Sequence, residues 1–388
     1  MRVTRRRRVL AIGWFGEDNL GDDAMLSGLL RLLDRSLGGA DVTVATRHPA
    51  KTAAAFGTRT IRRASPEDSG FTNREHLWAT LRSDLVTLGG GDLIREQADG
   101  VVPALNWLHR VRVALRLRRP VALVGISVGD LFSPLVIDRV SDYLRRIPLV
   151  AARDRASATR LAELGAGQVV TIGDLALEAF DAPLSIVGPA NERPRIGVVF
   201  REILGRGRDV PETANHTLQT ELAVALDRLA SGFGAQIELI PFRTRDSRPR
   251  PDDDARAGEA LAGRAASGVD WVRHRRPASA TAFAGLAAGL DLVIAVRLHG
   301  AVLGTSAGRP VVAIAYDAKT TGFLADLGLA DQALRLEATA DEIEAAARRT
   351  LADPTIADRT RAGVTAMREQ TRHIEPLLAG LAGVDPRG

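Results

Sequence analysis

The chain alternates short apolar segments rich in valine, isoleucine and leucine with longer segments in which leucines recur every three or four positions. The first kind is typical of buried strands and the second of amphipathic helices, so the alternation predicts an α/β fold with parallel strands. The strands that we expect in the first half are Val9–Gly13, Val42–Ala45, Leu85–Leu88, Val121–Gly125, Leu149–Ala152 and Val169–Ile172. Helices are expected between them, among others at Ala24–Leu37, Trp107–Arg118 and Ser157–Leu164.

The alternation pauses at Asp181–Arg195, which is rich in proline, glycine and asparagine, and we interpret this segment as a linker. The strands expected beyond it are Arg195–Phe200, Gln236–Pro241, Val269–Arg273, Leu290–Ala295 and Val311–Tyr316; the helices are Glu221–Gly232, Ala255–Gly263, Asp341–Leu351 and Ile356–Leu381, the last broken near Pro376. A chain of 388 residues exceeds the size at which one core usually stops growing. We therefore predict domains at 1–185 and 186–350, with helices at 351–388 that pack back on the first domain.

Charge and composition argue against several functions. The chain has no cysteine, which excludes disulfides and thiolate metal sites. The net charge is only +5 and aromatic residues are 4% of the chain, without basic and aromatic residues interleaved, so nucleic acid is not the expected partner. The acidic run Asp252–Asp254 lies in a charged segment, Arg243–Arg256, which we interpret as a mobile, solvated loop rather than a metal site.

No segment is long and apolar enough to suggest a membrane-spanning helix. The basic start, including Arg5–Arg8, resembles a signal peptide only superficially, because its apolar run is short and meets Glu17 and Asp18. We interpret that run as the first strand and expect a soluble, cytoplasmic protein with a solvated amino terminus.

The first candidate motif is the glycine-rich segment Gly13–Leu26, directly after the first expected strand. Its glycines allow a tight turn, and Asp22 or Asp23 is suited to cap the following helix. The spacing differs from the G-x-G-x-x-G of dinucleotide sites, which disfavours NAD. Two interpretations stay open: a loop that meets substrate with its helix amino terminus or carboxylates, or a capped strand-to-helix turn.

Two further motifs follow strands of the first half. The three glycines Gly89–Gly91 precede Asp92, and adjacent glycines indicate close approach of the backbone either to a ligand phosphate or to a neighbouring loop. Arg153 and Asp154 end another strand shortly before Ser157. We interpret Asp154 as half of a structural ion pair and leave Arg153 open between that role and ligand binding.

The most informative stretch is 291–329, which places Arg297, His299 and Lys319 at the ends of two apolar strands. Cations at strand ends beside a glycine, here Gly300, are suited to an anionic ligand, because ligands of open α/β sheets bind at the carboxyl ends of strands. Lys319 is one of two lysines in the chain, and Tyr316 follows the same strand. Arg201 has the corresponding strand-end position earlier in the second half.

Taken together, these motifs resemble the polysaccharide pyruvyl transferase family. The resemblance rests on the residues Gly13, Asn19, Gly21 and Asp22, Gly89–Gly91, Arg153-Asp154 with Ser157, and R-L-H-G followed by Y-D-x-K, in that order over residues 9–330. It implies two Rossmann-like domains facing a central cleft, similar to GT-B glycosyltransferases. It further implies phosphoenolpyruvate as donor, a sugar, glycan or glycolipid as acceptor, a pyruvate ketal as product and no cofactor.

The resemblance also suggests roles for the candidate residues. Phosphoenolpyruvate is a small polyanion, for which Arg201, Arg297 and Lys319 are the expected cations. His299 is the expected general acid, since imidazole titrates near neutral pH, and Asp22 is the expected base, with Asp92 next. The remaining expected substrate-binding residues are Asn19, Gly21, Gly90, Gly91, Asp92, Arg153, Tyr316 and Gly300.

Other functions stay open. A glycosyltransferase of similar architecture would use a nucleotide-sugar, and a non-catalytic relative would only bind glycans or anions. A transferase with the same donor but a small secondary metabolite as acceptor is a further alternative. Acceptor specificity is expected in loops of the first domain, such as Asp68–His76 and Glu96–Asn106.

Overall fold

The computed structural model describes residues 5–65, 72–97, 101–180, 193–203, 212–244, 252–266 and 271–384. Most of the expected linker, and parts of the two expected acceptor loops, lie outside these residues. The chain forms two compact units. The first unit comprises Met1–Glu17, Asp22–Ala179 and Arg368–Gly388, and the second comprises Asp18–Gly21 and Phe180–Met367.

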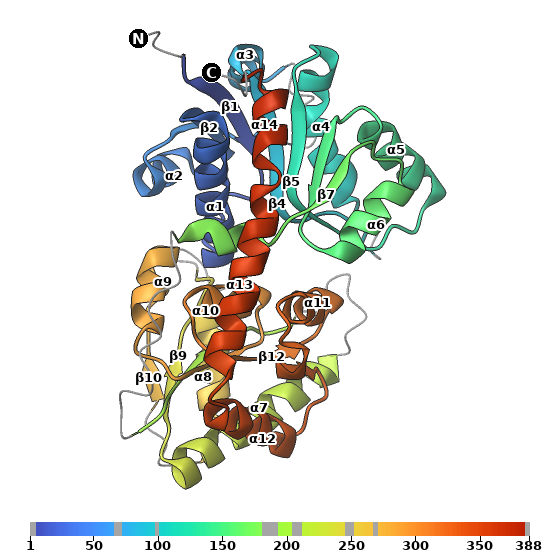
Figure 1. Cartoon of the computed structure of the whole chain (residues 1–388). Helices are drawn as coiled ribbons and strands as arrows, with labels where there is room; N and C mark the ends of the chain where they lie inside the picture. Colours follow the sequence, from blue (N-terminus) through green and yellow to red (C-terminus); the bar gives the residue numbers. More distant parts are fainter. Residues whose placement is uncertain are drawn as a thin grey trace. The chain divides into compact units, whose positions relative to one another are not determined.

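The first unit contains a seven-stranded parallel sheet in the order β3-β2-β1-β4-β5-β6-β7 (Figure 1). Its strands are β1 (Arg7–Ile12), β2 (Ala40–Thr46), β3 (Arg59–Arg62), β4 (Leu85–Ile94), β5 (Val121–Val128), β6 (Leu149–Ala152) and β7 (Val169–Thr171). Its helices are α1 (Leu20–Leu37), α2 (Pro49–Phe56), α3 (Arg74–Arg82), α4 (Pro103–Arg116), α5 (Pro134–Leu144) and α6 (Arg155–Glu163), with the 3₁₀ helix η1 (Leu175–Ala179). Regular helix–strand alternation explains why every pair in the sheet is parallel.

The second unit contains a six-stranded parallel sheet in the order β10-β9-β8-β11-β12-β13. The strands are β8 (Arg195–Val199), β9 (Gln236–Leu239), β10 (Trp271–Arg273), β11 (Leu292–Ala295), β12 (Val311–Ala315) and β13 (Ala333–Arg335). The helices are α7 (Glu212–Phe233), α8 (Asp254–Ala262), α9 (Ala280–Ala287), α10 (Leu298–Ser306), α11 (Ala318–Asp326) and α12 (Ala340–Ala352), with the 3₁₀ helix η2 (Ala330–Gln332). The predicted α/β class with parallel sheets is confirmed in both halves of the chain.

The carboxyl-terminal segment contains α13 (Ile356–Arg372) and α14 (Glu375–Leu381). The break expected near Pro376 falls between these helices, where proline occupies the first turn of α14. Within the first unit, Arg35 bonds Glu375 at 2.8 Å, and the Gly173 N–H donates to the Thr371 hydroxyl at 3.0 Å. The chain's last segment is therefore part of the first unit's structure.

Each sheet has one point at which the strand order reverses. In the first unit it lies between β1 and β4, and in the second between β8 and β11. Loops at the carboxyl ends of the two strands diverge there, which opens a crevice suited to ligands. The residues that follow these four strands are therefore the first to consider for function.

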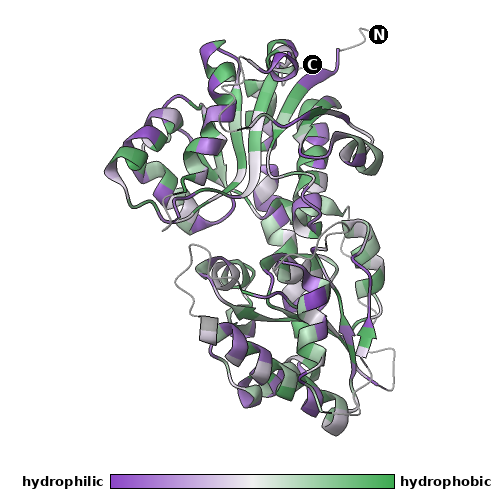
Figure 2. Ribbon diagram, turned by 180° about the vertical axis from the view of Figure 1, so that it is seen from behind, coloured by the Kyte–Doolittle hydropathy of each residue, from purple (hydrophilic) through white to green (hydrophobic). Residues whose placement is uncertain are grey.

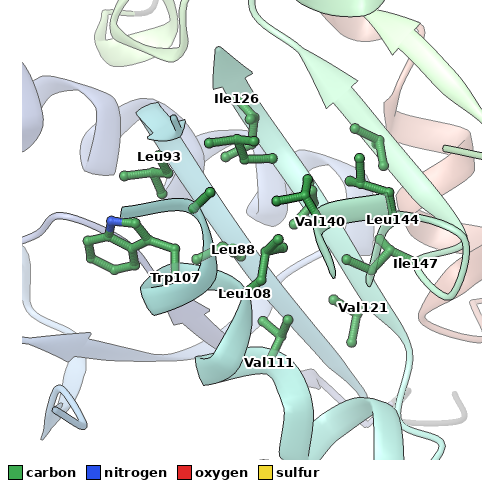
Figure 3. Close-up of a cluster of buried hydrophobic side chains, with 14 of the residues drawn as sticks. Leu88, Leu93, Trp107, Leu108, Val111, Val121, Ile126, Val140, Leu144 and Ile147 are labelled. Atoms are coloured by element: carbon green, nitrogen blue, oxygen red, sulfur yellow. The ribbon is translucent and has the colours of Figure 1, made fainter. Parts of the chain in front are cut away.

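The strands are buried because helices cover the sheets. Leu88 of β4, Ile126 of β5, and Trp107 and Leu108 of α4 belong to one apolar cluster in the first unit (Figure 3). A corresponding cluster in the second unit joins β8, β9, β11 and β12 to α7 and α12. Figure 2 shows hydrophobic residues along the strands of each unit and hydrophilic residues mainly on the helices.

One glycine lets helix α1 pack closely on η1. A Cβ added to Gly28 would lie 1.8 Å from the Leu175 carbonyl oxygen, whereas one added to Gly380 of α14 would meet nothing within 4 Å. We expect Gly28→Ala to lower the free energy of unfolding by about 1–3 kcal/mol, because the helix has to shift. Gly380→Ala, in the same unit, should instead raise it by up to about 1 kcal/mol. Urea unfolding of both variants checks this, and equal effects would contradict the packing role of Gly28.

Candidate functional site

Arg201 and Tyr316 come together at the carboxyl end of the second sheet. Arg201 follows β8 and Tyr316 follows β12, and both side chains are partly buried. The Arg201 Nη1 lies 3.3 Å from the Tyr316 hydroxyl, and the guanidinium carbon lies 5.6 Å from the ring centroid. Stacking on an aromatic ring leaves a guanidinium charged and orients its donors, which suits it to a carboxylate or phosphate.

Arg297 follows β11, on the other side of the switch point, and is held by a buried carboxylate. Its side chain pairs in two-pronged fashion with Asp254, with Nε 2.6 Å from Oδ2 and Nη2 bonded to Oδ1. Arg297 is 8% and Asp254 3% exposed. An ion pair this buried has a fixed geometry, and the carboxylate offsets much of the arginine's charge. Binding of phosphoenolpyruvate by Arg297 stays a prediction. The structure adds that Asp254 pairs with this arginine.

Asp254 also organises the turn after β9. The same carboxylate accepts hydrogen bonds from the backbone N–H groups of Phe242 at 3.0 Å and Arg243 at 2.9 Å. Two backbone donors and a guanidinium satisfy a buried carboxylate well. Asp254 therefore ties the end of β9 to the end of β11.

The expectation that the run Asp252–Asp254 is merely solvated is wrong, because all three side chains make structural contacts. Asp253 caps α8 by accepting from the N–H of Ala255, and Asp252 lies 3.0 Å from Arg243. Within the segment expected to be mobile, 245–251 lies outside the described residues, and the acidic run itself is structured. An aspartate just before an expected helix is a capping signal that could have indicated this.

The segment Asp18–Gly21 is part of the second unit although the chain around it belongs to the first. The Leu20 N–H donates to the Phe242 carbonyl at 2.8 Å, and Asn19 forms an antiparallel bridge with Arg243. The segment thus pairs with the same turn that Asp254 holds. The Gly21 N–H also lies 3.2 Å from the Asn19 side-chain oxygen.

Gly21 lies against the ring of His299. A Cβ on Gly21 would come within 2.4 Å of both Cγ and Nδ1 of this histidine. Gly21 has no positive φ, so its lack of a side chain is explained by the imidazole rather than by backbone strain. His299 lies in the first turn of α10, two residues after Arg297. Two motifs almost 280 residues apart in sequence therefore meet in the second unit.

This contact gives a specific prediction. Gly21→Ala should displace the His299 ring. Because His299 is the predicted general acid, and misplacement of an acid by about 1 Å is costly, we expect turnover to fall by about tenfold or more. In a His299→Ala background the same substitution should have almost no further effect. Steady-state kinetics of the two single variants and the double variant measures this coupling. Additive losses would contradict the contact as the cause.

Two other predicted residues of this edge have defined positions. Lys319 is partly buried in the first turn of α11, directly after β12, and Asp317 caps that helix by accepting from the Thr320 N–H. Gly300 packs α10 on the sheet, since a Cβ there would lie 2.8 Å from the Cβ of Val199. The structure thus gives Gly300 a packing role, and a direct contact of Gly300 with substrate stays a prediction.

In the first unit, Asp22 is buried in the first turn of α1, where the helix dipole stabilises a carboxylate. The expectation that Asp22 or Asp23 caps this helix is wrong, because α1 begins earlier, at Leu20. Asn19, just before the helix, instead accepts from the Gly21 N–H. Asp22 lies inside the helix and therefore does not cap it.

The triple glycine serves the sheet itself. β4 does not end at Leu88 but continues to Ile94, with positive φ at Gly90 and Gly91 and a register shift against β5. A Cβ on Gly89 would lie 2.3 Å from the Val124 carbonyl oxygen. Close approach to neighbouring backbone is therefore what the structure shows for Gly89, whereas ligand binding by Gly90 and Gly91, which lie against the Met25 side chain, stays a prediction. Asp92, next in β4, lies 3.7 Å from Arg95.

Arg153 forms a buried ion pair, but not with its neighbour. Its Nη1 lies 3.1 Å from Asp174, and both side chains are almost fully buried. Asp154 caps α6 instead, accepting from the Ser157 N–H at 2.7 Å. The prediction that Asp154 pairs with Arg153 is wrong, because Asp154 is instead the N-cap of α6. Ligand binding by Arg153 stays a prediction.

Hydrogen bonds of Glu96 join the segments that follow β4 and β5 in the first sheet. We call this set of bonds the Glu96 tie. The Glu96 carboxylate accepts hydrogen bonds from the Ser133 hydroxyl and from the N–H groups of Ser133 and Phe132. These bonds, above all that of the hydroxyl, lower the pKa of Glu96. The tie is therefore complete above the ordinary pKa of a glutamate and is lost as pH falls through the lowered value.

The sequence model of the family described as polysaccharide pyruvyl transferase matches residues 19–318, about three quarters of the chain. The chain belongs to this family. The match includes every predicted site residue except Lys319, which follows its last residue directly. Family membership supports a transferase that acts on polysaccharide, so the residues at the switch point of the second sheet are candidates for a substrate-binding site. None of the curated proteins matches the chain in sequence.

Several solved structures of similar fold contain UDP or a UDP-sugar. The chain is 12% identical to MnaA of S. aureus in a co-structure with UDP, with a TM-score of 0.61 and 98% of each chain covered. It is 16% identical to Alr3699/HepE of Anabaena in complex with UDP-glucose, with a TM-score of 0.62, covering 97% of this chain and 100% of the other. UDP-GlcNAc 2-epimerase of Neisseria meningitidis is 12% identical, with a TM-score of 0.60, covering 96% and 99%. These likenesses confirm the predicted GT-B-like fold.

No helix among the described residues of this pyruvyl transferase family member has the length and apolar character needed to cross a membrane.

Proposed function

We propose that the protein transfers the pyruvyl group of phosphoenolpyruvate to two hydroxyls of one sugar in a glycan, with release of phosphate. The observation that carries this proposal is the meeting of His299 with Gly21 beside the Arg297–Asp254 pair. It combines a group that can move a proton with a cation of fixed orientation, at the switch point of the second sheet. Family membership supports a pyruvyl transferase that acts on polysaccharide.

The donor's charges fit the cations at this edge. Phosphoenolpyruvate carries a phosphate and a carboxylate, so its site needs several donors. Arg201 stacked on Tyr316 and Arg297 fixed by Asp254 each present an oriented guanidinium, and Lys319 adds an ammonium at the start of α11. We assign the donor to these residues.

The reaction needs proton transfer to carbon and then between oxygens. His299 gives a proton to C3 of phosphoenolpyruvate, and the electron-poor C2 that results forms a bond with the first sugar hydroxyl. The C2–O bond to phosphate then breaks, and the second hydroxyl bonds to C2, which completes the ketal. The proton of the first hydroxyl passes to the leaving phosphate, and His299 regains a proton from solvent for the next turnover. A carboxylate takes up the proton of the second hydroxyl. Asp22 is our first candidate, because it follows Gly21 directly in the chain, and Asp92 is the second.

Mass spectrometry of the products tests the reaction. Incubation with phosphoenolpyruvate and a panel of glycosides should add about 70 Da to one acceptor, which is pyruvate less one water, together with release of inorganic phosphate. In D₂O the added group should be heavier by about one unit, since one methyl hydrogen then comes from solvent. Phosphate release without a mass gain, or no reaction across the panel, would contradict the proposal.

One observation supports a second candidate, a glycosyltransferase. A small pocket at the ends of β8, β9 and β10 is lined by apolar residues that include Phe200 and Ile240, together with His274 and the acidic residues Asp254 and Glu259. Apolar lining is suited to the face of a nucleotide base, and the three similar structures described above contain UDP or a UDP-sugar. Release of UDP from a UDP-sugar in the presence of a glycan, with no use of phosphoenolpyruvate, would favour this candidate.

A further inference from the structure

Trp14 is a large aromatic residue exposed at the switch point of the first sheet. It lies in the loop that follows β1, the strand at which the order of the sheet reverses. Its exposed fraction is 38%, whereas Phe15 and Glu17 of the same loop are 2% exposed. An indole on a carboxyl-end loop is placed where α/β sheets bind ligands, and none of the roles assigned above uses it.

Trp107 and Arg63 pack against the Trp14 indole and hold it in place. Its ring makes an edge contact with Trp107, at 5.8 Å between centroids and 69° between planes, and Arg63 lies 5.1 Å from the ring centroid. Trp107 belongs to the buried cluster of the first unit (Figure 3). Arg63 is itself fixed by the Glu17 carboxylate at 2.7 Å and the Gly13 carbonyl at 3.1 Å. A ring supported on this side loses little freedom when a ligand covers its outer face.

We propose that the outer face of Trp14 binds the apolar face of a pyranose ring in the glycan acceptor. The C–H groups on one side of a pyranose carry partial positive charge and match the negative face of an indole. The cations of the second unit are assigned to the donor, so this inference rests on the proposed function. Arg47 lies 3.5 Å from Glu17 with its side chain half exposed, and its guanidinium is suited to bond sugar hydroxyls.

Calorimetric titration of the whole protein with methyl α- and β-glycosides of glucose, galactose, mannose and N-acetylmannosamine tests the assignment. We expect at least one glycoside to bind the wild type, Trp14→Ala to weaken that binding by about tenfold or more, and Trp14→Phe to weaken it less. Binding to Trp14→Ala within about twofold of wild type overturns the proposal. So does the absence of saturable binding by every glycoside in the panel.

Trp78 provides the matched control. It is 60% exposed on α3 and also lies beside an arginine, with Arg82 at 5.1 Å from its ring, but it is on a helix rather than at the switch point. Trp78→Ala should leave glycoside binding unchanged, and an equal loss in both variants overturns the proposal. Thermal unfolding of each variant shows whether the fold is retained.

Kinetics with phosphoenolpyruvate separates this inference from the proposed function. Trp14→Ala should raise KM for the glycan and leave KM for phosphoenolpyruvate unchanged. If ketal forms and the variant keeps the wild-type KM for glycan, the stacking face is wrong and the function stands. If glycosides bind through Trp14 but no phosphate is released, the function is wrong and the stacking face stands.

Discussion

Replacement of His299 by alanine is expected to lower kcat with phosphoenolpyruvate by about 10²- to 10⁴-fold, the usual contribution of a positioned general acid. KM for phosphoenolpyruvate should change little, because the cations that hold the donor remain. The physical reason is that protonation of C3 creates the electrophile, and water replaces a positioned imidazole poorly. Phosphate release under saturating donor and acceptor measures the effect.

The control for this variant is His216→Ala. His216 is exposed on α7, where its ring lies 3.4 Å from Arg264, and nothing in the proposed reaction uses it. Its removal should leave kcat unchanged. Near-wild-type turnover of His299→Ala would remove this histidine from the role of acid, while a large loss in both variants would point to a general effect of losing a histidine.

Replacement of Asp254 by alanine is expected to destabilise the protein by about 3–5 kcal/mol, because it leaves the buried Arg297 charge without its carboxylate. It also takes the acceptor from two backbone N–H groups of the turn that pairs with Asn19 and Leu20. KM for phosphoenolpyruvate should therefore rise as well. Urea unfolding and donor titration measure the two effects.

Asp253→Ala is the control at the neighbouring position. Asp253 caps α8, so its loss should cost about 0.5–2 kcal/mol and leave KM for phosphoenolpyruvate unchanged. The double variant Asp254→Leu with Arg297→Met separates stability from binding, since replacing both partners of a buried pair by apolar groups is often almost neutral. It should recover the part of the lost stability that comes from the unpaired Arg297 charge, but not the part that comes from the N–H groups of Phe242 and Arg243, and none of the donor affinity. Recovery of donor affinity would contradict the role of Arg297.

The fold could be predicted wherever a strand is buried on both faces. Central strands such as β1, β5 and β11 consist mainly of valine, leucine, isoleucine and alanine, so their composition reveals them. The edge strands β3 and β13 were not predicted, because an edge strand of three or four residues needs little apolar sequence. The end of β4 was misplaced because glycines with positive φ continue the strand through a bulge.

The sequence by itself determined the class of fold, the family and the residue types available for chemistry, since these depend on local periodicity and on the order of motifs along the chain. Only the tertiary structure decided which residues are partners. Asp254, which was expected to be solvated, pairs with Arg297; Asp174 rather than Asp154 pairs with Arg153; and Gly21 makes room for His299. Pairing of this kind depends on which strand ends the sheet order brings together, and that order is not written in the spacing of any single motif.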